Sequence, residues 1–116
     1  MEFFEYTDDE IYALATPIIE RMNQAANSCN YGLFSMGFSK KMADLVGEEK
    51  FNMQMKKNIP EKGELGSYTL LGCIRRESGV TVVYKQVTKK SRGELLAQLL
   101  LDKEDGEIKV FYAGIQ

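Results

Sequence analysis

The most informative absence in this 116-residue chain is that of histidine, which does not occur at all. Without histidine there can be no serine–histidine or cysteine–histidine nucleophile, no histidine-ligated zinc and no imidazole acid–base group. We predict neither a resident metal nor a cofactor.

Cysteine is scarce. Cys29 and Cys73 are far apart in the chain and belong to no CxxC pair, so the sequence predicts neither a zinc ribbon nor a redox dithiol. We expect two free, mostly buried thiols, because cysteine commonly packs as a small hydrophobic residue. A single disulfide between them is the alternative.

Long apolar runs are also missing. No stretch approaches the roughly 18 consecutive apolar residues that would suggest a membrane-spanning helix. Residues 1–10 are acidic and lack the basic and apolar segments of a signal peptide. We therefore expect no membrane partner and a cytoplasmic protein; export, with a leader removed, is the alternative.

Neither sign of charge dominates, since 15 lysines and arginines face 17 aspartates and glutamates, for a net charge of -2. A nucleic-acid surface depends on accumulated positive charge, so no nucleic-acid partner is predicted. The length suits one domain spanning residues 1–116, and no repeat or linker divides it.

The first half of the chain has helical periodicity. Thr7 and Glu10 form a capping-box pattern, and the apolar stripe after them predicts a first helix over residues 8–27. Pro17 lies inside this segment. Because an interior proline removes a hydrogen bond and clashes with the preceding turn, we expect a kink or a break near residues 13–16.

Shorter helical segments come next. Ser39 is a predicted N-cap, while Pro60 and Gly63 mark the end of the helical half. The predicted segments are a helical turn within residues 31–38 and helices over 40–46 and 48–58.

After Glu64 the pattern changes to that of strands. Three turn signals interrupt it, and Asp105-Gly106 is the strongest because this dipeptide favours two-residue hairpins. Four long antiparallel strands in a meander should twist and curl. The predicted fold class is α+β, with N-terminal helices packed on a curved four-stranded antiparallel meander sheet; the strands are 68–74, 80–88, 93–101 and 107–115.

The two faces of this sheet differ. Alternation in the third strand places Leu95, Ala97, Leu99 and Leu101 on a core face. The opposite face is half apolar and carries Leu96, Leu100 and Val83; by the same alternation Phe111, Ala113 and Ile115 belong to it. This is more apolar surface than a monomer usually exposes, so we predict a homodimer through that face.

Four segments carry a family resemblance, and they are Gly63 to Tyr68, Val82 to Tyr84, Leu99 to Leu101 and Asp105 to Val110. With the order of helices and strands, they resemble the cone-like fold of the nuclear transport factor 2-like (cystatin-like) superfamily, in particular its small bacterial members of unknown function. The last strand of those members follows a D-G-x-W-K-I-x-G type pattern. Here Ile108 stands at the aromatic position, and Gly114 comes one residue later than the pattern places it. The superfamily contains isomerases, dehydratases, cyclases and non-catalytic binding domains, so fold alone does not decide function.

A pocket is expected between the helices and the concave side of the sheet. We predict that its ligand-binding residues are Tyr31, Phe34, Phe38 and Tyr84, beside a methionine-rich helix. Since no clearly buried carboxylate is available, we predict no catalytic residue. The chain is interpreted as a non-catalytic module that binds a small apolar ligand or a protein.

An alternative is a small lyase or isomerase that acts on an apolar carbonyl compound through an aspartate–tyrosine pair, as the resemblance implies. An apolar pocket would raise the pKa of such a carboxyl toward neutrality. Asp44 is the candidate base, although its neighbours Lys40 and Lys41 favour a solvated surface charge. The candidate donors are Tyr12, Tyr31, Tyr68, Tyr84 and Tyr112.

Overall fold

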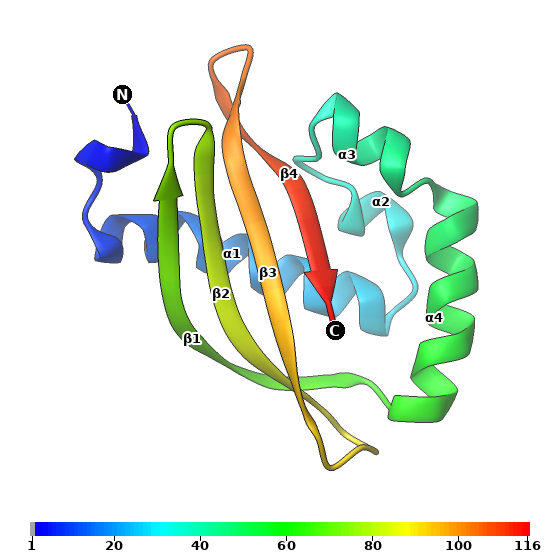
Figure 1. Ribbon diagram of the computed structural model, residues 1–116. Helices are drawn as coiled ribbons and strands as arrows, with labels where there is room; N and C mark the ends of the chain where they lie inside the picture. The colour runs from blue at the N-terminus through cyan, green and yellow to red at the C-terminus, as the bar shows by residue number, and fades with distance from the viewer. Residues whose placement is uncertain (1) are drawn as a thin grey trace.

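The structure, a computed structural model, describes residues 2–116 and has a helical N-terminal half followed by a four-stranded antiparallel sheet (Figure 1). This confirms the predicted α+β class. In chain order the elements are η1 (Phe3–Glu5), α1 (Asp8–Asn27), α2 (Tyr31–Phe34), α3 (Lys40–Leu45), α4 (Glu48–Lys62), β1 (Leu65–Arg76), β2 (Gly79–Thr88), β3 (Glu94–Glu104) and β4 (Glu107–Ile115).

Helix α1 crosses one face of the curved sheet, and α2, α3 and α4 lie beyond the β4 edge (Figure 1). We call the face packed against α1 the inner face and the opposite one the outer face. The strand order is β1-β2-β3-β4, so the predicted meander is confirmed.

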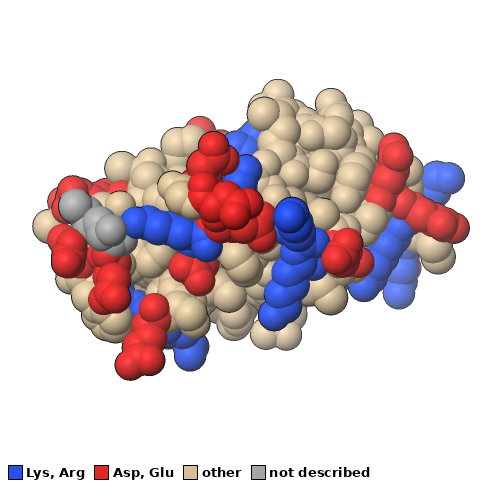
Figure 2. All heavy atoms as spheres, turned by 90° about the horizontal axis from the view of Figure 1, so that it is seen from above, with Lys and Arg blue, Asp and Glu red and all other residues tan. Residues whose placement is uncertain are grey.

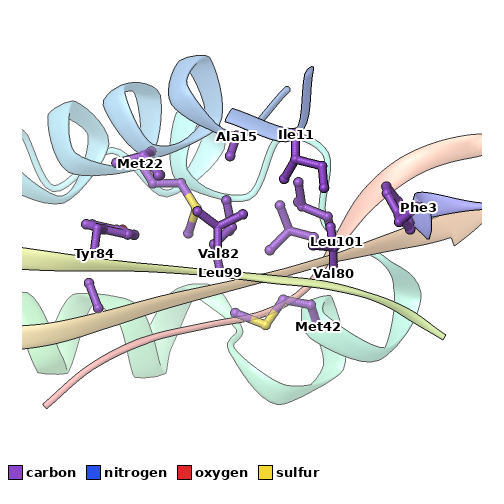
Figure 3. Close-up of a cluster of buried hydrophobic side chains, with 13 residues drawn as sticks. Phe3, Ile11, Ala15, Met22, Met42, Val80, Val82, Tyr84, Leu99 and Leu101 are labelled. Carbon is purple, nitrogen blue, oxygen red and sulfur yellow. The ribbon is translucent and has the colours of Figure 1, made fainter. Parts of the chain in front are cut away.

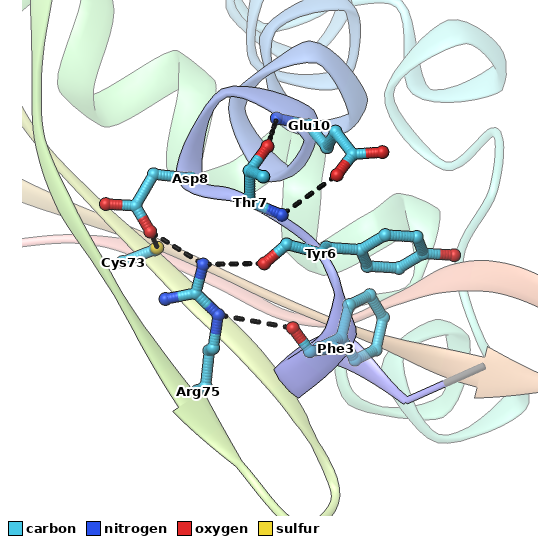
Figure 4. Close-up of polar contacts among 7 residues, drawn as sticks. All are labelled: Phe3, Tyr6, Thr7, Asp8, Glu10, Cys73 and Arg75. Carbon is cyan, nitrogen blue, oxygen red and sulfur yellow. Dashed lines mark hydrogen bonds and ion pairs between the residues drawn. The ribbon is translucent and has the colours of Figure 1, made fainter.

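The start of α1 is the predicted capping box. The Glu10 amide donates to Thr7 Oγ1 at 3.1 Å, and the Thr7 amide donates to Glu10 Oε1 at 3.0 Å (Figure 4). The helix then runs unbroken through Pro17, so the break considered near residues 13–16 does not occur. An interior proline costs about 3 kcal/mol, which the burial of several side chains such as Ile11 and Ile19, at roughly 2 kcal/mol each, outweighs.

The end of α1 is a Schellman motif. The amide of Asn30 donates to the carbonyl of Ala25 at 2.9 Å, and the amide of Cys29 donates to that of Ala26 at 3.2 Å. Cys29 occupies the left-handed position with a φ of 51°. Because this turn lies at the surface, Cys29 is exposed, and the expectation of a buried thiol is wrong there. Cys73 is half-buried, and both cysteines are free.

Helix α4 is longer than its sequence pattern predicts. It continues past Asn58 and through Pro60 to Lys62. Pro60 lies in the last turn, and that turn is still closed by a hydrogen bond of 2.9 Å from the Gly63 amide to the Ile59 carbonyl. The predicted cap of α3 is confirmed, since the Met42 amide donates to Ser39 Oγ at 3.1 Å.

The sheet contains bulges that the alternation pattern does not reveal. In the register of β3 and β4, Leu101 faces Val110 and Leu100 faces Tyr112, which leaves Phe111 as an extra residue. Cross-strand partners share a face, and beyond this bulge the alternation of β4 is reversed. Ala113 and Ile115, paired with the inner residues Leu99 and Ala97, therefore lie on the inner face. Their predicted place on the outer face is wrong.

The core lies between α1 and the inner face (Figure 3). Ala97, Leu99 and Leu101 are buried there as predicted, and Leu95 is half-buried. Other buried core side chains are Ile11, Ala15, Ile19 and Met22 of α1 and Val80, Val82 and Tyr84 of β2.

Arg75 of β1 binds the N-terminal segment to the sheet. This segment includes η1, a short helix that the sequence pattern does not predict. Its guanidinium donates to the carbonyl of Phe3 at 3.2 Å, to the carbonyl of Tyr6 at 2.9 Å and to Asp8 Oδ1 at 2.6 Å (Figure 4). The hydrogen bond from Arg75 lowers the pKa of Asp8. Burial and the Asp8 carboxylate raise the pKa of the Cys73 thiol.

The surface carries both signs of charge. Figure 2 shows acidic and basic side chains scattered over one face, with large uncharged areas between them. Among residues 2–116, no helix is both long and apolar enough to cross a membrane.

Candidate ligand pocket

A pocket of about 200 Å³ lies between the C-terminal half of α1, the last turns of α4 and the end of the sheet where β4 terminates. Its wall is mostly apolar. The lining side chains used below are Met22 and Asn23 of α1, Phe34 of α2, Gln54, Met55, Asn58, Ile59 and Lys62 of α4, Tyr84 and Thr88 of β2, Leu95 of β3, and Ala113 and Ile115 of β4.

Two of the four predicted ligand-binding residues, Phe34 and Tyr84, line this pocket. Tyr31 and Phe38 lie outside the lining. The Tyr31 hydroxyl donates to the carbonyl of Val46 at 2.6 Å, and the Phe38 ring packs edge-on against Phe34 at 5.4 Å. These two residues join the helical segments that surround the pocket.

The wall contributed by β2 changes from apolar to polar along the strand. Tyr84, Gln86 and Thr88 alternate onto the inner face, after the apolar Val80 and Val82. Burial raises the pKa of Tyr84 to about 12, so its hydroxyl is neutral at physiological pH and can donate a hydrogen bond. That hydroxyl makes no hydrogen bond to residues 2–116.

Gln86 is fully buried, and its side-chain amide is fully bonded. Its Oε1 accepts from Asn23 Nδ2 at 3.0 Å, and its Nε2 donates to the carbonyls of Gly66 at 3.0 Å and Val87 at 2.8 Å. The β1 ladder is irregular between Leu65 and the next paired residue, and the Gln86 amide fills this gap. Gln86 therefore stabilises the pocket wall.

Thr88 differs from Gln86 because its buried hydroxyl has no partner. The side chain is 7% exposed, and Oγ1 makes no hydrogen bond to any described residue. Leaving such a group unsatisfied costs about 1–3 kcal/mol. The other buried side-chain atom without a partner among residues 2–116 is Arg21 Nε, and Arg21 is not part of the lining.

Helix α4 supplies a polar row along the pocket. Gln54, Asn58 and Lys62 recur at steps of four residues and so share one helix face. Met55 and Ile59 add apolar surface beside them. Lys62 is the one charged side chain in the described lining.

The residues of the enzymatic alternative are not gathered in the pocket. Asp44 is exposed on α3 and lies outside the lining, as do Tyr12, Tyr68 and Tyr112. Within the described chain, no aspartate or glutamate side chain lines the pocket, and no group of metal-ligating side chains is large enough to hold an ion.

A carboxylate–tyrosine pair does exist elsewhere on the inner side, and sequence reasoning missed it. The Tyr68 hydroxyl donates to Glu20 Oε1 at 3.0 Å. Burial and the Glu20 carboxylate raise the pKa of Tyr68. Glu20 is exposed, and neither residue belongs to the pocket wall.

Comparison of the chain with protein-family models and with curated proteins found no match. The geometry of the pocket is therefore the main guide to function.

Proposed function

We propose that this protein is a non-catalytic binding domain that holds one compact, mainly apolar small molecule in the pocket at the end of its sheet. The observation that carries the proposal is the buried hydroxyl of Thr88, a residue of the pocket lining, because this hydroxyl has no partner among residues 2–116. Buried polar groups are usually hydrogen-bonded, so an orphaned one in a pocket wall indicates a missing partner.

The size and chemistry of the pocket support an apolar ligand body. Its volume of about 200 Å³ exceeds the roughly 150 Å³ of an engineered cavity that binds benzene. Met22, Phe34, Leu95 and Ile59 offer apolar contacts around the polar groups. A few polar anchors in an apolar wall are typical of small-molecule sites.

We also propose that the chain is a member of the nuclear transport factor 2-like superfamily. Helix α1 against the inner face of a curved meander sheet, with the shorter helices beside it, resembles the layout that the nuclear transport factor 2-like superfamily implies. The polar groups of this lining favour binding over turnover, because no carboxylate side chain of the described residues stands beside Tyr84 as a base. A lyase or isomerase remains the alternative, and turnover assays on every compound that binds would reveal it.

A panel of single-ring carbonyl compounds, steroids and short lipids, followed by NMR titration, tests ligand binding. Leu95→Trp should fill the pocket and abolish the saturable shifts of the pocket amides. Leu45→Trp is the matched control, because Leu45 is an exposed leucine of α3 that belongs neither to the pocket lining nor to the outer face. Binding that survives Leu95→Trp, or a panel in which nothing binds, would contradict the proposal.

Thr88→Val provides a second test that does not depend on filling the pocket. Valine keeps the shape of threonine and removes the orphaned hydroxyl, so the ligand-free variant should melt at a higher temperature than the wild type and bind more weakly. A variant that melts lower and binds equally well would show that the hydroxyl has a structural role.

We also propose that the protein forms a homodimer through its outer face. Leu71, Ile74, Leu96 and Tyr112 are 60%, 50%, 37% and 47% exposed, although they belong to strands of one sheet. Charges of both signs flank this apolar area, including the ion pair of Lys85 and Glu94 at 2.9 Å. We propose a second copy as the occupant of this surface, because a twofold axis can place the lysine of one copy near the glutamate of the other.

A further inference from the structure

Two residues that carry hydrogen-bond donors, Thr88 and Lys62, come from adjacent elements at one end of the pocket. Thr88 pairs with Leu65 at the end of β2, and two residues later the Lys90 amide donates to the carbonyl of Lys62 at 2.9 Å. This bond brings the end of α4 next to the end of β2. Thr88 and Lys62 therefore contribute to the same end of the pocket, and both belong to its lining.

The ammonium group of Lys62 has no ion pair with any residue of the described chain, whereas nearby Lys89 is paired with Glu64 at 3.2 Å. The acidic neighbours Glu61 and Glu64 are outside the lining. A lysine at the last position of a helix also interacts favourably with the helix dipole, so its presence there has a structural reason of its own. The helix dipole does not explain why Lys62 lines the pocket at the same end as the unpartnered Thr88 hydroxyl.

These groups select the chemistry of a ligand's polar end. An ammonium group can only donate hydrogen bonds, and a threonine hydroxyl can donate one as well. A carboxylate only accepts, and hydrogen bonds between ionised partners are about twice as strong as neutral ones. A ligand amine would meet the positive charge of Lys62, and a neutral amide would leave that charge without a counterion.

We infer that the pocket binds a compact apolar carboxylic acid, with its ionised carboxylate held by the Thr88 hydroxyl and the Lys62 ammonium. This inference rests on the proposed binding function and names its ligand class. The apolar body, one ring or a short branched chain, packs between Phe34, Tyr84 and Leu95. The apolar walls of the pocket thus limit the size of the ligand, and the polar end of the pocket selects the charge of the ligand.

The test uses three probes of nearly equal size, 3-phenylpropionate, 3-phenylpropionamide and 3-phenylpropylamine, titrated into the full chain and followed by NMR. The carboxylate should bind about tenfold more tightly than the amide, because it adds a charge-assisted hydrogen bond. The amine should bind most weakly. Equal or tighter binding of the amide or the amine would overturn the inference.

Two variants with matched controls assign the effect to the named groups. Lys62→Gln should remove the preference for the carboxylate over the amide, and the control Lys57→Gln changes an exposed lysine of the same helix outside the lining. Thr88→Val should weaken both probes, and the control Thr81→Val changes the same strand on its outer face. A carboxylate preference that persists in Lys62→Gln would overturn the inference, even if Thr88→Val did not fold.

Failure of this inference and failure of the proposed function give different results. If neutral compounds of the broader panel bind the wild type but not Leu95→Trp, while the carboxylate has no advantage, the binding function stands and the ligand class is wrong. If neither the three probes nor the panel shifts any pocket resonance, both are wrong.

Discussion

Cys29 occupies a backbone conformation that suits glycine, with a φ of 51° at the end of α1. A side chain in the left-handed region costs about 1 kcal/mol, which glycine avoids. Cys29→Gly should therefore raise the free energy of unfolding by up to about 1 kcal/mol in urea denaturation. Cys29→Ala is the control, since alanine removes the thiol and keeps the strain. An equal gain in both variants would assign the effect to the thiol.

Tyr84 should be the last tyrosine to ionise in the folded protein. Burial raises its pKa to about 12 from the ordinary value of 10.0, so the folded state disfavours its ionised form. The stability that this group contributes is complete below pH 10 and is lost as the pH rises toward 12. Titration of tyrosinate absorbance should show a late component that Tyr84→Phe lacks. A component unchanged in that variant would contradict the assignment.

At the scale of elements, the ion pair between Arg75 of β1 and Asp8 at the start of α1 makes the free energy of unfolding depend on pH in the acidic range. Arg75 lowers the pKa of Asp8, so the contribution of this pair is present above the ordinary carboxyl pKa of 3.8 and is lost as the pH falls through the lowered value. In urea denaturation at a series of pH values, Asp8→Asn should lose less stability on acidification than the wild type. A variant that loses as much stability on acidification as the wild type would contradict this prediction.

Features that depend on a few neighbouring residues are predicted well from the sequence. The capping box of Thr7 and Glu10 forms as expected, and the Asp105-Gly106 turn has the positive φ angles, 54° and 80°, of a two-residue hairpin. The bulge at Phe111 escapes prediction because it depends on how β4 pairs with β3. No local pattern marks which residue of a strand will be the unpaired one.

The same distinction applies to the pocket. The aromatic residues Phe34 and Tyr84 are conspicuous in the sequence, and both line it. Thr88 is inconspicuous, because threonine is common in strands and nothing local marks an unpartnered hydroxyl. Lys62 escapes prediction because Pro60 favours a helix that ends at Asn58; only the longer α4 aligns Lys62 with Gln54 and Asn58.

On the scale of the whole molecule, its smallest extent of 18 Å corresponds to one sheet and one layer of helices, each about 10 Å thick. No third layer covers the outer face within residues 2–116. Leu100 faces Thr81 and Tyr112 in neighbouring strands and so lies near the centre of this face. Leu100 would therefore lie near the centre of the proposed dimer contact.

If the outer face joins two copies, Leu100→Lys should give a folded monomer, because a lysine pair at the centre of a twofold interface would be repulsive and desolvated. Sedimentation velocity over micromolar concentrations measures the change. Leu45→Lys is the matched control, since Leu45 is an exposed leucine on α3 away from the sheet. A wild type that sediments as a monomer at high micromolar concentration would refute the dimer.

The bulge in β4 gives the strand a spare residue. Since Leu101 faces Val110 and Leu100 faces Tyr112, deletion of Phe111 would leave every other partner of β4 in place. Ala113, which lines the pocket, would still face Leu99 after such a deletion. Loss of one residue from a regularly paired part of a strand would instead shift the remainder of that strand to the opposite face. Deletion of Phe111 should therefore keep the pocket-lining residues of β4 on the inner face.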